Sequence, residues 1–125
     1  GHSAFLARAG RAAEGVRFPL LFALKENNTE ARDFVEGFTV RHGTPPDFTA
    51  VYAYDATRML IDAVRRGGLN RARIREALAG LSPWRGLTGL IQWDGTGQNL
   101  SGRLGMGLIR DGKIISAAGE YSSQY

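Results

Sequence analysis

The middle of the chain contains three successive stretches in which apolar side chains recur at intervals of three and four, the spacing of amphipathic helices. The first begins after Asn28, a strong N-cap residue, and is expected to run to about Arg41. The second is expected over residues 48–66, and Asn70 should cap the third. The centre of the chain is therefore predicted to be helical.

Strand patterns lie on both sides of this helical centre. On the N-terminal side, a helix over residues 4–13 is expected to end near Gly15, and the apolar run 16–23 suits a buried strand. Pro19 lacks a backbone N–H, so this strand is predicted to lie at a sheet edge or to contain a bulge.

On the C-terminal side, strands are expected over residues 87–93, 104–110 and 113–117. Asp111-Gly112 separates the last two and predicts a type I′ hairpin turn, because both central residues of such a turn need positive φ. The cluster 94–97 predicts another turn. The order of helix, strand, three helices and strand hairpin indicates the α/β class, or α+β for a fragment, without regular βαβ alternation.

Charge keeps one alternative function open. The 125 residues carry 16 basic and 12 acidic side chains, and the net charge is +4. This surplus is compatible with a basic interaction or nucleic-acid-binding module, for which the arginines of residues 65–75 offer a phosphate-facing patch. However, acidic residues alternate with arginines along the chain, and no helix-turn-helix pattern surrounds the patch. We therefore expect no nucleic-acid partner.

Catalytic and metal-binding chemistry has little support in the sequence. The chain has no cysteine, and no serine lies in a Gly-x-Ser-x-Gly setting. His42 is placed in the last turn of an expected helix, where an imidazolium interacts favourably with the helix dipole. Residues 102–107 depart from the phosphate-binding glycine pattern, and residues 94–99 from the calcium-loop pattern. The chain is expected to be no enzyme and to hold no metal or cofactor.

Three segments occur in an order that resembles a known family. Residues 12–15 read Ala-Ala-Glu-Gly, residues 54–56 read Tyr-Asp-Ala, and residues 86–94 read Gly-Leu-Thr-Gly-Leu-Ile-Gln-Trp-Asp. The series is similar to the Ala-Ala-Glu-Gly, Tyr-Asp-Ala and Gly-x-Thr-Gly-x-Ile-x-Phe-Asp succession of the periplasmic branched-chain amino acid binding proteins of ABC importers. The resemblance covers residues 4 to about 118, with Trp93 in place of the commoner phenylalanine.

This resemblance implies the type I periplasmic-binding-protein fold, in which two α/β lobes close on a small ligand. Residues 1–125 are expected to form a single domain, the C-terminal part of a larger two-lobed protein, with residues 1–3 a cloning remnant. Residues 4–24 and the tail strands would belong to the second lobe. The helices of residues 28–81 would complete the first lobe.

The resemblance also implies a receptor for amino acids or similar small polar solutes, located in the periplasm or elsewhere outside the cytoplasm. Its partners would be the ligand, which the chain shares with the remainder of the protein, and the permease of an ABC importer. The main grip on the ligand would lie in that remainder. In isolation, the apolar strand 18–22 and the helix face 56–64 would leave apolar surface uncovered, so the chain is expected either to self-associate or to adopt a compact domain unlike its place in the larger protein.

Within this chain, ligand contacts are expected where the long helix begins. The family commonly places an aromatic residue just after a Pro-Asp pair, and the matching positions hold Phe48 and Thr49. Tyr52 is the next candidate, because its ring and hydroxyl suit a wet cleft; packing within the helix stripe is its alternative role. Asp55 is expected to stabilise the first turns of the helix electrostatically.

Overall fold

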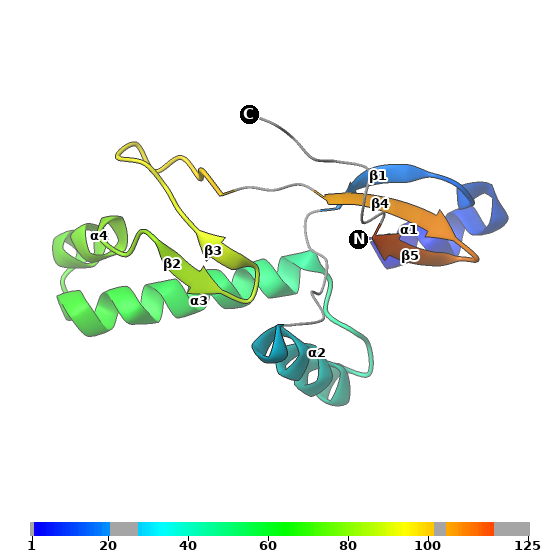
Figure 1. Cartoon of the computed structure of the whole chain (residues 1–125). Coiled ribbons are helices and arrows are strands. Elements are labelled where there is room, and N and C mark those ends of the chain that lie inside the picture. Colours follow the sequence, from blue (N-terminus) through cyan, green and yellow to red (C-terminus); the bar gives the residue numbers. More distant parts are fainter. Residues whose placement is uncertain (1, 21–27, 102–104, 117–125) are drawn as a thin grey trace. The chain divides into compact units, whose positions relative to one another are not determined.

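The computed structural model describes residues 2–20, 28–101 and 105–116, with side chains from Phe5 onward (Figure 1). The chain divides into two compact units. Residues 1–24 and 103–125 form the sheet unit, and residues 25–102 form the helical unit. This grouping agrees with the expected division of the chain between two lobes, except that residues 87–93 fall in the helical unit. The assignment of residues 1–125 to a single domain stays a prediction.

The sheet unit contains one helix and three antiparallel strands. Helix α1 (His2–Ala9) continues as a 3-10 turn, η1 (Gly10–Ala13), in place of a single helix to residue 13. Strand β4 (Gly105–Arg110) lies between β1 (Arg17–Leu20) and β5 (Lys113–Ser116). The prediction from Pro19 is therefore confirmed, since β1 is an edge strand; the rest of the expected strand, residues 21–23, lies outside the described residues.

A tight turn and two hydrogen bonds from the segment before β1 hold this unit together. Asp111 and Gly112 have φ values of 51° and 68°, which confirms the tight turn expected between β4 and β5. Glu14 then binds the turn, because its Oε1 accepts a hydrogen bond from the Asp111 N–H at 3.1 Å. The Gly15 N–H donates to the Ile109 carbonyl at 2.9 Å, so the corner before β1 is fixed against the central strand.

The three predicted helices of the helical unit are present: α2 (Thr29–His42), α3 (Phe48–Gly67) and α4 (Arg71–Ala79). Asn28 and Asn70 cap α2 and α4, each accepting a hydrogen bond from the backbone N–H three residues on. Gly43 ends α2 in the left-handed conformation, with φ 72°.

The expected strand over residues 87–93 is confirmed only in part, at residues 89–91. The structure has a hairpin there, formed by β2 (Trp84–Gly86) and β3 (Gly89–Ile91), with Leu87 and Thr88 in the turn. The apolar run was mistaken for one strand because the turn lacks its usual polar signal. Its backbone N–H groups bind a buried carboxylate from α3 instead of a residue nearby in sequence.

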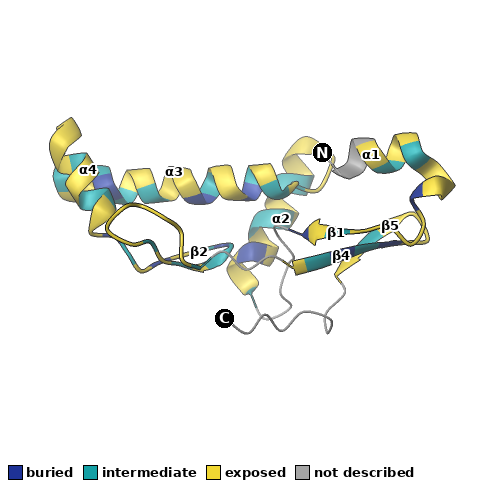
Figure 2. Cartoon of the chain, turned by 90° about the horizontal axis from the view of Figure 1, so that it is seen from above, coloured by how far each residue is buried: buried dark blue, intermediate teal, exposed yellow. Residues whose placement is uncertain are grey.

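The core of the helical unit lies between α3, α4 and the hairpin. Ala63, Leu81 and Trp84 are buried together, and half-buried apolar side chains from α3, α4 and residues 91–93 pack around them. Figure 2 shows how buried positions alternate with exposed ones along α3. The indole N–H of Trp84 donates to Asp62 at 3.0 Å, so the buried ring keeps a polar partner. The hairpin is thereby attached to α3.

Candidate functional site

The first turn of α3 carries a negatively charged cap. Asp47 accepts hydrogen bonds from the Ala50 N–H, at 3.0 Å, and from the hydroxyl of Thr49. These bonds favour the ionised form, so the Thr49 hydroxyl and then the Ala50 N–H hold the pKa of Asp47 below its ordinary value. The carboxylate is exposed to solvent. It occupies the positive end of the helix dipole, where an anionic ligand group would otherwise be favoured.

The three residues predicted to contact a ligand lie on this first part of α3. Phe48 is half-buried, Thr49 is exposed, and Tyr52 is 40% exposed. Residues four apart on a helix share a face, so the rings of Phe48 and Tyr52 are neighbours along one side of α3. Thr49 contributes to the cap through its hydroxyl. Ligand contact by these three residues stays a prediction.

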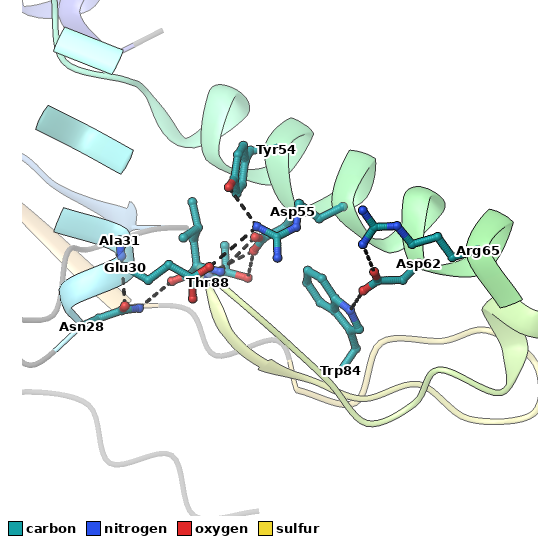
Figure 3. A network of polar contacts seen from close by, with 11 residues as sticks. Asn28, Glu30, Ala31, Tyr54, Asp55, Asp62, Arg65, Trp84 and Thr88 are labelled. Carbon is teal, nitrogen blue, oxygen red and sulfur yellow. Dashed lines mark hydrogen bonds and ion pairs between the residues drawn. The ribbon is translucent and has the colours of Figure 1, made fainter. Parts of the chain in front are cut away.

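Tyr54 has its ring and its hydroxyl both engaged within the unit. The ring lies 4.6 Å from that of Phe34 on α2, centroid to centroid. The hydroxyl accepts a hydrogen bond from Arg58 at 3.0 Å, and Arg58 lies 3.8 Å from Glu30 on α2 (Figure 3). Tyr54 therefore connects α3 to α2. Of the two tyrosines at the start of α3, Tyr52 is the more exposed.

A buried carboxylate, that of Asp55, lies two turns after Phe48, the first residue of α3. Asp55 is 2% exposed and accepts three hydrogen bonds: from the Leu87 N–H at 2.8 Å, the Thr88 N–H at 3.0 Å and the Thr88 hydroxyl at 2.7 Å (Figure 3). The expectation that Asp55 acts on the first turns of its own helix is wrong. The carboxylate points at the hairpin turn, whose two N–H groups have no β-ladder partner in the turn.

The same turn is held from its other side by α2. The side-chain amide of Asn28 donates to the Leu87 carbonyl at 3.0 Å while its oxygen caps α2 (Figure 3). Asn28, Asp55, Leu87 and Thr88 therefore form one polar node that joins α2, α3 and the hairpin. The sequence did contain a signal for it: Tyr-Asp-Ala and Gly-x-Thr-Gly, which carried the resemblance as separate motifs, supply the two partners Asp55 and Thr88.

Two further expectations concern sites of other kinds. Asp94 accepts bonds from the Thr96 hydroxyl, Thr96 N–H and Gln98 N–H, at 2.6, 2.8 and 3.0 Å, and these lower its pKa, the Thr96 hydroxyl most. Its loop is the turn that was predicted. His42 is the last residue of α2, and its ring lies 4.3 Å from that of Phe38. The part of the chain that the structure describes holds no group of three or more His, Cys, Asp or Glu placed to bind a metal.

Comparison with known proteins gives these features a context. The arrangement of helices and strands is that of the type I periplasmic-binding fold. Residues 2–113 match the family model described as periplasmic binding protein, and the chain belongs to this family. No curated protein matched the chain.

Several solved structures share the fold. A leucine-binding protein of Thermotoga maritima is 26% identical over 93% of this chain and 33% of its own, with a TM-score of 0.81. An ABC transporter substrate-binding protein of Desulfitobacterium hafniense in complex with leucine is 26% identical over 93% of this chain and 40% of its own, with a TM-score of 0.76. The third structure is a branched-chain amino acid transporter substrate-binding protein of Streptococcus pneumoniae. It is 22% identical over 90% of this chain and 32% of its own, with a TM-score of 0.80, and it shows the fold alone.

The chain thus spans between 32% and 40% of the length of these three proteins. The first is a leucine-binding protein and the other two are substrate-binding proteins of transporters; these are binding proteins and not enzymes, as the sequence resemblance predicted. Within the described ranges, no helix is both long and apolar enough to cross a membrane.

Proposed function

We propose that the chain is part of the ligand-binding receptor of an ABC-type importer for amino acids or similar small polar solutes. The match of residues 2–113 to the periplasmic binding protein family carries this proposal. The leucine-binding protein of T. maritima and the leucine complex of the D. hafniense protein support the ligand class. The receptor works outside the cytoplasm, in the periplasm or at the cell envelope, and delivers its ligand to an ABC permease. The comparisons do not favour a basic nucleic-acid module.

The chain's own share of the ligand site is the start of α3, with Phe48, Thr49 and Tyr52. Asp47 fills the helix N-terminus with negative charge, so this end of α3 does not suit the carboxylate of an amino acid. It suits the ammonium group or the apolar side chain, for which the rings of Phe48 and Tyr52 offer a surface. The ligand carboxylate is then bound by the remainder of the receptor, which shares the ligand with this chain.

Precise placement of these residues follows from the polar node. Asp55 lies three residues after Tyr52, and its hydrogen bonds to Leu87 and Thr88 prevent α3 from rotating against the hairpin. Asn28 adds α2 to the same turn. Contacts that position a ligand require side chains on such a rigid support. Structural stability and ligand recognition are thereby linked through a single helix.

The proposal is tested by titrating the isotope-labelled 125-residue chain with leucine and following backbone amide shifts. Because the main grip is outside the chain, we expect weak but saturable binding. Tyr52→Ala should weaken it about tenfold, the loss expected for removing one aromatic contact, and Tyr52→Phe should retain most of it. Tyr54→Phe is the matched control and should bind as the parent does. Absence of saturable shifts, or a Tyr52→Ala variant that binds as tightly as Tyr54→Phe, would contradict the proposal.

A further inference from the structure

The connection between α3 and α4 exposes a leucine. Leu69 is 95% exposed, more than any other large apolar side chain among the described residues. One exposed apolar residue is ordinary on a protein surface. Leu69 differs because of the charges on both sides of it in the sequence.

Residues 65–75 carry five arginines and no acidic residue, and all five arginines are exposed. These eleven residues are named here the arginine tip. The nearest acids along the chain are Asp62 and Glu76. Asp62 forms an ion pair with Arg65 at 3.9 Å and also accepts a hydrogen bond from Trp84, so one of the five arginines has an acidic partner. The arginine tip therefore carries several positive charges, and the apolar side chain of Leu69 lies between them in the sequence. Its charged members are Arg65, Arg66, Arg71, Arg73 and Arg75.

The backbone of the arginine tip has a defined shape. A Cβ at Gly67 would stand 2.8 Å from the carbonyl carbon of Arg73, so α4 begins in close contact with the end of α3. Gly68 caps α3 with φ 66°, and its N–H donates to the Val64 carbonyl at 2.8 Å. Asn70 caps α4 through the Arg73 N–H at 3.1 Å. Leu69 lies between these two fixed ends, on a turn whose backbone conformation is set.

We propose that the arginine tip docks on an anionic phospholipid surface, with Leu69 placed among the lipid headgroups. Guanidinium groups bind phosphate in a forked geometry, and each basic residue near an anionic membrane strengthens binding about fivefold. The headgroup layer has an apolar region beneath it that receives the leucine. A nucleic-acid backbone offers no such region, which is why Leu69 favours a lipid surface. This inference is independent of the proposed receptor function.

The test is co-sedimentation of the 125-residue chain with vesicles of phosphatidylcholine alone or mixed with phosphatidylglycerol. We expect binding only to the vesicles that contain phosphatidylglycerol, with a steep loss as salt is raised. Failure to bind these vesicles at low salt, or equal binding to both kinds, would overturn the proposal.

Variants locate the binding surface. The pair Arg71→Gln and Arg73→Gln should weaken binding about 25-fold, and Leu69→Ser about tenfold at unchanged charge. The controls are Arg8→Gln with Arg11→Gln, which removes the same charge elsewhere, and Val40→Ser, at a side chain 88% exposed on α2. Circular dichroism verifies folding of each variant. Control variants that lose as much binding as the tip variants would show attraction by net charge alone.

Competition distinguishes the class of partner. Polyglutamate and duplex DNA, added at the same total negative charge as the vesicles, should displace the chain poorly. Either competitor could instead displace the chain, and Leu69→Ser could weaken binding to that competitor as much as binding to vesicles. This result would assign the arginine tip to an acidic protein or a nucleic acid, against the proposal.

Discussion

Thr88 donates two hydrogen bonds to the carboxylate of Asp55, from its backbone N–H at 3.0 Å and from its hydroxyl at 2.7 Å. With the bond from Leu87, three donors surround a carboxylate that is almost completely buried. Such a carboxylate is tolerated in the core because its oxygens have partners. The partners depend on it in turn, since the turn residues have no other acceptor nearby in a β-ladder.

Replacing this carboxylate should be strongly destabilising. Asp55→Ala leaves the N–H groups of Leu87 and Thr88 without acceptors, so the free energy of unfolding should fall by about 3 kcal/mol. Urea denaturation followed by circular dichroism measures the change. Asp33→Ala, at an exposed position of α2, should change it by less than about 0.5 kcal/mol. Equal effects of the two substitutions would show that the node contributes nothing special to stability.

Gly86 leaves room for this node. A Cβ at Gly86 would stand 2.4 Å from the Trp84 ring and 2.5 Å from the Asp55 carboxyl group. Gly86→Ala should therefore lower the free energy of unfolding by about 1–3 kcal/mol, the usual cost of an overfilled core. Gly95→Ala is the control, because a Cβ there meets nothing within 4 Å. Thermal melts of both variants test the expectation, which a Gly86→Ala variant as stable as its control would refute.

The cap of α3 should be visible in a titration. The hydroxyl of Thr49 is the main cause of the lowered pKa of Asp47, so Thr49→Val should raise that pKa toward its ordinary value. Because the folded-state pKa is depressed, the stabilisation by Asp47 is present above the unfolded-state pKa and is lost as pH falls through the folded-state pKa. Carbon-13 NMR of the carboxyl group measures the shift. The hydroxyl of Thr57 donates to the Ala53 carbonyl within the helix, so the control Thr57→Val should leave the pKa of Asp47 unchanged.

The outer face of α3 supports the expected self-association of the isolated chain. Leu60 and Ile61 are 49% and 41% exposed. Light scattering should show a mass that rises with concentration, and the double substitution Leu60→Ser and Ile61→Ser should reduce that rise. A strict monomer with a cooperative melt at every concentration would count against self-association.

Local signals in the sequence predicted most of the elements correctly. Asn28 and Asn70 mark helix starts, and Asp111-Gly112 marks a hairpin, because each acts on backbone groups within a few residues. The turn at Leu87 and Thr88 was missed for the opposite reason. Its acceptor, Asp55, lies 32 residues before Leu87 in the chain, so no local pattern contains both partners.

The candidate site was only partly predictable. Periodicity predicts the helix that carries Phe48, Thr49 and Tyr52, and the family resemblance implies their contact with a ligand. The structure adds that Asp47 closes the helix N-terminus. It also separates Tyr52 from Tyr54, two tyrosines that sequence spacing alone treats alike. Tyr54 is less exposed than Tyr52 and packs against Phe34 on α2, a tertiary contact that no local pattern contains.

Labelling with photo-leucine, the diazirine analogue of leucine, tests whether the start of α3 contacts the ligand. The analogue is irradiated in the presence of the 125-residue chain, and the labelled residues are identified by peptide mass spectrometry. We expect labelling concentrated on residues 48–52 that excess leucine suppresses. Labelling that leucine does not suppress, or that falls mainly on other described residues, would contradict it.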